Sequence, residues 1–216
     1  GSPAADHAHG SDDDGHADTD AGGGVLVVLD PERLSQPVAT VEVGAHPAHV
    51  VADRSGRAYA SLSGGNEIAV VDLAQAEVIE RIATGAYPHG LRLSPDESEI
   101  YVANVEDGSV SVIDTQDLTE VARIPVGAAP VQVGFTPSGD QVYVSLRDEN
   151  RVAVIDRASR KVEGKIDVGP GPIQLVATPD GKHVYVANQG PEDAPNDTVS
   201  VIDTATGQVV QTLKTG

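Results

Sequence analysis

Residues 99–114 read Glu-Ile-Tyr-Val-Ala-Asn-Val-Glu-Asp-Gly-Ser-Val-Ser-Val-Ile-Asp, and this stretch decides the fold. Two short runs rich in Val and Ile flank the turn residues Glu-Asp-Gly. β-Branched side chains that alternate with other residues are typical of β-strands, whereas helical spacing of apolar residues is not sustained anywhere in the chain. The stretch therefore predicts two strands joined by a turn, in a protein that is almost entirely β.

The same pattern recurs along the chain with a period of about 42 residues. Three markers share this register, and the last step of the Asp and Gly markers is 47 residues because of an insertion of about five residues within 189–196. The markers are Asp30, Asp72, Asp114, Asp156 and Asp203; Tyr59, Tyr101, Tyr143 and Tyr185; and Gly44, Gly85, Gly127, Gly169 and Gly216. Each unit contains four apolar runs, so the period indicates a β-propeller with one four-stranded antiparallel sheet per unit.

The repeat divides the chain into a tail and an incomplete propeller of about 4.5 blades. We expect a disordered Asp/His-rich tail over residues 1–24, a half-blade over 25–43, and blades over 44–84, 85–126, 127–168 and 169–216. The half-blade lacks its two inner strands, which we expect sequence after Gly216 to supply. The alternative, a self-contained five-blade ring without those strands, would leave an open edge.

The amino-acid composition narrows the classes of function that this protein can have. The 14 basic and 33 acidic residues give a formal net charge of -19, which argues against binding to nucleic acid and favours cationic partners such as divalent metal ions. The chain has no Cys, which excludes disulfides, thiolate ligands and thiol nucleophiles. No apolar run approaches 18 residues, so we expect no membrane insertion.

Several motifs resemble the YVTN β-propeller repeat. They are Leu93-Ser-Pro-Asp96, Tyr101-Val-Ala-Asn104, Thr178-Pro-Asp-Gly181 and Tyr185-Val-Ala-Asn188. The resemblance covers residues 25–216, although the first blade departs from it at Ala52-Asp-Arg-Ser-Gly56 and at Ala58-Tyr-Ala-Ser61. It implies a bacterial extracytoplasmic propeller, periplasmic or secreted to the cell surface, whose signal peptide has been removed. Similar propellers serve as surface modules, lactonases, heme-protein partners and metal carriers, so the resemblance leaves the function open.

Histidines of the inter-blade loops form the first candidate site. His46 and His49 flank Pro47, and His89 follows Pro88 in the next blade. These loops precede the innermost strands, so the three imidazoles could converge at the mouth of the channel. Imidazole nitrogens suit zinc or copper, with a carboxylate or water completing the coordination. The alternative is that Pro-His-Gly is a variant of the inter-blade turn with no metal.

The tail holds the second candidate metal-binding cluster, His7, His9 and His16 among several Asp residues. Such a segment could capture a divalent metal and pass it to the propeller, as in the periplasmic zinc-carrier propellers that this pattern resembles. The alternative is a solubilising acidic linker.

Catalysis is the least favoured hypothesis, because the sequence has no nucleophile elbow, phosphate loop or His-Glu-x-x-His motif. We therefore expect a binding module without catalytic residues or an organic cofactor. Two alternatives stay open. One is a non-catalytic interaction propeller that binds a partner protein or pairs through its unfinished edge. The other is a lactonase-like hydrolase that uses His89, Glu106 and Arg147.

Overall fold

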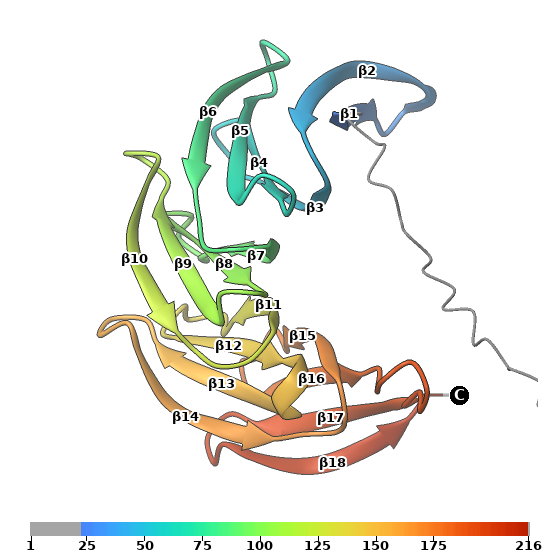
Figure 1. The fold of residues 1–216 in the computed structure, drawn as a ribbon, viewed down its shortest axis with the longest axis vertical. Coiled ribbons are helices and arrows are strands. Elements are labelled where there is room, and N and C mark those ends of the chain that lie inside the picture. The colour runs from blue at the N-terminus through green and yellow to red at the C-terminus, as the bar shows by residue number, and fades with distance from the viewer. Residues whose placement is uncertain (1–22, 216) are drawn as a thin grey trace, which may run out of the picture.

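The computed structural model describes residues 23–215, which form one two-stranded and four four-stranded antiparallel sheets (Figure 1). The half-blade contains β1 (Gly24–Asp30) and β2 (Arg33–Gly44). Blade 1 contains β3 (Pro47–Ala52), β4 (Arg57–Leu62), β5 (Glu67–Asp72) and β6 (Glu77–Ala83). Blade 2 contains β7 (Pro88–Leu93), β8 (Glu99–Asn104), β9 (Ser109–Asp114) and β10 (Thr119–Pro125). Blade 3 contains β11 (Pro130–Phe135), β12 (Gln141–Leu146), the 3₁₀ turn η1 (Arg147–Glu149), β13 (Arg151–Asp156) and β14 (Lys161–Asp167). Blade 4 contains β15 (Pro172–Ala177), β16 (His183–Asn188), β17 (Thr198–Asp203) and β18 (Gln208–Lys214).

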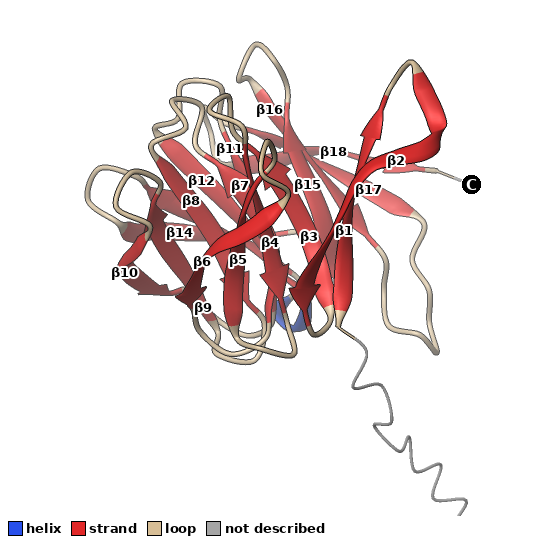
Figure 2. Ribbon diagram, turned by 90° about the horizontal axis from the view of Figure 1, so that it is seen from above, coloured by secondary structure: helices blue, strands red, loops and turns tan. Residues whose placement is uncertain are grey.

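These sheets confirm the predicted fold class, an incomplete β-propeller of four-stranded antiparallel blades. The strands of each blade pair in chain order, and the blades follow one another along an arc (Figure 1). The first strands of successive blades, β3, β7, β11 and β15, contact one another and line the inner side of the arc. Strand and loop account for nearly all of the described residues (Figure 2). Among them, no helix has the length and apolar character needed to cross a membrane.

The core lies between the blades rather than within one sheet. Tyr59, Tyr101 and Tyr143 occupy the same position of β4, β8 and β12, and each packs into the apolar cluster shared with the following blade. All three are buried, whereas Tyr185 at the same position of β16 is 38% exposed. The repeated Tyr is therefore the residue through which one blade packs against the next.

The repeated Asp has a local role in the turn that follows the third strand of each blade. The Asp114 carboxylate accepts hydrogen bonds of 2.8 Å from the backbone N–H groups of Gln116 and Asp117. The turn then passes through a left-handed residue, Leu118, with φ 53°. Asp72, Asp156 and Asp203 accept equivalent bonds in the other blades. The Asp that recurs in each repeat therefore forms a turn and does not serve to bind a ligand.

Candidate functional site: a histidine pair between two blades

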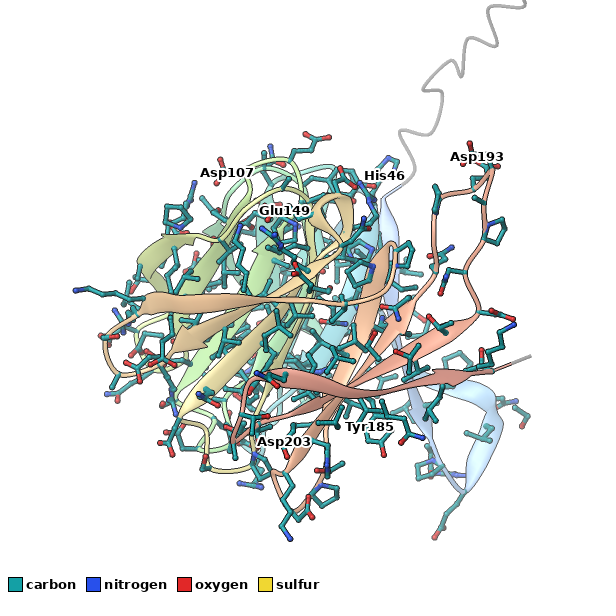
Figure 3. All side chains as sticks on the ribbon, turned by 90° about the horizontal axis from the view of Figure 1, so that it is seen from below. His46, Asp107, Glu149, Tyr185, Asp193 and Asp203 are labelled. Carbon is teal, nitrogen blue, oxygen red and sulfur yellow. The ribbon has the colours of Figure 1, made fainter. Side chains whose placement is uncertain are left out.

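The loops that enter the inner strands share one end of the molecule with the loops between second and third strands. Figure 3 shows His46 of the first loop type at the same end as Asp107, Glu149 and Asp193 of the second type, with Asp203 at the opposite end. In each loop of the first type, the residue before the Pro adopts a left-handed conformation, with φ 53° at His46. The loops therefore lead into their inner strands with the same backbone conformation.

His49 and His89 meet where the inner strands of blades 1 and 2 lie side by side. Their ring centroids are 4.8 Å apart and their planes are inclined by 65°. His49 comes from β3 and His89 from β7, and both side chains are partly buried. Both residues sit where the pairing of the inner strand with its neighbour is interrupted by a bulge. Bulges redirect side chains, and here they bring two imidazoles of different blades into contact.

Hydrogen bonding and burial set the protonation of the two imidazoles. His89 Nδ1 lies 3.3 Å from the carbonyl oxygen of Val131. Because a carbonyl can only accept, Nδ1 carries the proton and leaves the Nε2 lone pair free in the neutral ring. The pKa of His49 is lowered below 6.5, chiefly by burial and then by the positive charges that His89 and Arg92 can carry. His49 is therefore neutral near pH 7, as a metal ligand must be.

His46, also predicted as a ligand, is not part of this pair. His46 lies in the exposed loop, where its carbonyl oxygen accepts the Ser63 N–H at 3.1 Å. No group of three or more His, Asp or Glu within residues 23–215 is arranged to hold a metal ion. The expected convergence of His46 with His49 and His89 is therefore corrected to a pair, since His46 precedes the strand and stays in the loop. His7, His9 and His16 lie outside the described residues.

Two glutamines continue the polar lining along the inner strands. Gln132 and Gln174 occupy the position of His49 in blades 3 and 4, and Gln132 Nε2 donates to Gln174 Oε1 at 3.1 Å. The equivalent residue of blade 2 is Gly90, where a Cβ would lie 2.4 Å from the Gln132 side chain. These two glutamines are not among the residues predicted from the sequence, although their spacing of 42 residues from each other, in register with His49, was the available signal.

The residues considered for a hydrolase do not share a cavity. Glu106 and Arg147 line a cavity of about 600 Å³ between blades 2 and 3, and His89 is not among its lining residues. The Arg147 guanidinium is paired with Asp148 at 2.8 Å. A larger cavity of about 690 Å³ lies among the turns that include Asp140 and Arg157, at the opposite end of the blades. A hydrolytic activity thus stays a hypothesis from sequence.

Comparison with solved structures agrees with the fold. Hydrazine synthase from Kuenenia stuttgartiensis superposes with a TM-score of 0.74 and 28% sequence identity, covering 78% of this chain and 49% of that chain. This chain therefore spans about half the length of the matched chain. Among curated proteins, none matches the sequence significantly.

A family model gives the closer assignment. The model of the cytochrome D1 heme domain matches residues 18–170, which is well over half of the chain. The β-propeller that the resemblance implies is thus confirmed, whereas the YVTN repeat in particular stays a prediction from sequence. Because the match covers most of the chain and the structure has the repeated antiparallel blades of a propeller, this chain belongs to the cytochrome D1 heme domain family.

Proposed function

We propose that this chain is an extracytoplasmic, non-catalytic propeller that binds a transition metal ion, zinc or copper, through His49 and His89. The observation that carries the proposal is the contact between two imidazoles from different blades, with ring centroids 4.8 Å apart. The hydrogen bond from His89 Nδ1 to a backbone carbonyl adds support, because metal-ligating histidines commonly donate their second ring nitrogen in this way.

A site with only two protein ligands differs from a structural metal site. Structural zinc sites are closed by four protein ligands, whereas sites that exchange ligands keep open positions. A His49–His89 site would leave positions for water or for a ligand donated by a partner. The formal net charge of -19 would raise the local concentration of divalent cations. These features favour reversible binding, as in a metal carrier, over a structural metal.

The acidic tail extends the proposal. His7, His9 and His16 lie in a segment rich in Asp, and we propose that this segment collects divalent metal for the histidine pair. Capture by the tail should be weaker than binding at the propeller, because the disorder expected from the sequence of the tail would be lost on binding.

Calorimetric titration with zinc and with copper near neutral pH tests the proposal. We expect one tight site per chain in the unaltered protein. His49→Ala and His89→Ala should each weaken binding by at least about tenfold, because each removes one of two protein ligands. His46→Ala is the matched control, since it removes an exposed imidazole from the same loop and should leave the affinity unchanged. Equal affinity in all four proteins would contradict the proposal.

The family name raises heme as an alternative ligand, and the cavity that His49 lines does not fit it. A tetrapyrrole needs a large slot, and small-molecule pockets usually exceed about 300 Å³. The cavity that His49 lines, together with Val25, Pro47 and Val50, measures only about 190 Å³. The flat aromatic side chains that could stack on a macrocycle are also scarce, at five Tyr and one Phe.

We therefore expect that hemin added to the protein will give no saturable Soret shift, and that any spectral change will be the same in the His49→Ala variant. A saturable one-to-one shift that His49→Ala or His89→Ala abolishes would show that the histidine pair serves a heme instead of a bare metal ion.

A further inference from the structure

A single buried hydroxyl bridges the two histidines through their backbones. Ser61, on β4, accepts a hydrogen bond of 3.1 Å from the His49 N–H and donates one of 2.6 Å to the His89 carbonyl oxygen. Its side chain is fully buried. One oxygen atom is thus bonded to both residues whose rings form the pair, and it joins blade 1 to blade 2 at that point.

The bulges explain why this hydroxyl is needed. Pairing of β3 with β4 is irregular between Pro47 and Val50, and pairing of β7 with β8 is irregular between Pro88 and Leu91. Backbone groups freed from a strand ladder in a buried place require other partners. Ser61 satisfies one donor and one acceptor left by the two bulges, so its hydroxyl fixes the separation of the two backbones.

The chain repeats this arrangement once, 84 residues later, without histidines. Ser145 accepts a hydrogen bond of 3.1 Å from the Gln132 N–H and donates one of 2.8 Å to the Ile173 carbonyl oxygen. It is also fully buried, and it joins blade 3 to blade 4. The equivalent residues of blades 2 and 4 are Ala103 and Ala187, so odd-numbered and even-numbered blades differ.

Resting on the proposed metal site, we infer that Ser61 is a positioning residue that holds the His49 and His89 rings in contact, so that both can reach a shared metal ion. Ser145 performs the same inter-blade bonding at a place without imidazoles. Comparison of the two serines therefore separates positioning of the site from general stabilisation of a blade interface.

The test compares Ser61→Ala with Ser145→Ala in the full chain. Both variants should lose similar unfolding stability, because each leaves the same two backbone groups without their hydroxyl partner. Only Ser61→Ala should weaken zinc affinity, by roughly tenfold, the size expected from loss of one buried hydrogen-bonding group. Ser61→Thr keeps the hydroxyl and should retain zinc affinity. If Ser61→Ala does not fold, Ser61→Gly also removes the hydroxyl and takes its place, with the same expected loss of zinc affinity.

A measurement without metal distinguishes failure of this inference from failure of the proposed function. Nuclear Overhauser contacts between the rings of His49 and His89 should be strong in the unaltered protein and in Ser145→Ala, and weaker in Ser61→Ala. Unchanged ring contacts in Ser61→Ala would overturn the positioning role whether or not the protein binds zinc. Absence of zinc binding in the unaltered protein, with the expected loss of ring contacts, would overturn only the metal site.

Discussion

At the scale of single residues, Asp53 shows how hydrogen bonds to a turn carboxylate make the stability of the protein depend on pH. Asp53 lies in the turn between β3 and β4, where burial by itself raises the pKa of its carboxyl group. Hydrogen bonds from Ser55, the Arg57 N–H and the Tyr59 hydroxyl outweigh burial and lower that pKa to about 2, from 3.8. A carboxyl with a depressed pKa in the folded state stabilises the protein at neutral pH.

The sign of this effect gives a pH prediction. The contribution of Asp53 to stability, about 2 kcal/mol, should be fully present above about pH 4 and be lost as the pH falls through about 2. Asp53→Asn should therefore be less stable than the unaltered protein at pH 7, with a difference that shrinks between about pH 4 and pH 2. Urea unfolding followed by circular dichroism measures both proteins. A difference that stays constant across this range would refute the assigned role.

The candidate site was only partly predictable at this scale. Spacing placed His49 and His89 in the loops that precede successive inner strands, whereas both lie on the strands themselves, β3 and β7. Spacing also could not show that the two rings are in contact. The position of His46 depends on the left-handed backbone before Pro47, which the sequence signals weakly. Ser61 carried no signal of its own, because its importance comes from two backbone groups that only the folded bulges bring to it.

At the scale of strands and blades, the sequence was most informative, because alternation and turn residues are local properties. All four strands of each unit formed as the repeat predicted, since each strand and each turn is encoded within a few residues. What the repeat could not show is which surface of a blade is covered. Tyr143 and Tyr185 both lie in a Val-Tyr-Val motif, yet Tyr143 is 1% exposed and Tyr185 is 38% exposed.

This difference predicts unequal costs of truncation. Tyr143→Ala should reduce the free energy of unfolding by about 3 to 5 kcal/mol, because it opens a cavity between blades 3 and 4. Tyr185→Ala should cost about 1 kcal/mol or less, as expected for a partly exposed side chain. Denaturant titration of both variants gives the comparison. Equal losses would mean that a further surface covers Tyr185 in solution.

At the scale of the whole molecule, the blades alternate in character, and the proposed metal site uses one junction between them. Ser61 and Ser145 mark the junctions after blades 1 and 3, and only the first carries imidazoles on both sides. Membership of the cytochrome D1 heme domain family fixes the architecture, but the ligand depends on the side chains that line each junction. In this chain the junction between blades 1 and 2 carries two imidazoles in contact, with ring centroids 4.8 Å apart.

The most direct test of this account follows the imidazole nitrogens of all seven histidines by long-range proton–nitrogen NMR while zinc is added to the intact protein. We predict that the signals of His49 and His89 change together and are complete at one equivalent, with His46 and His183 unaffected. The tail histidines should respond only to further metal. A response confined to His7, His9 and His16, with His49 and His89 unchanged, would contradict the claim that the propeller holds the metal.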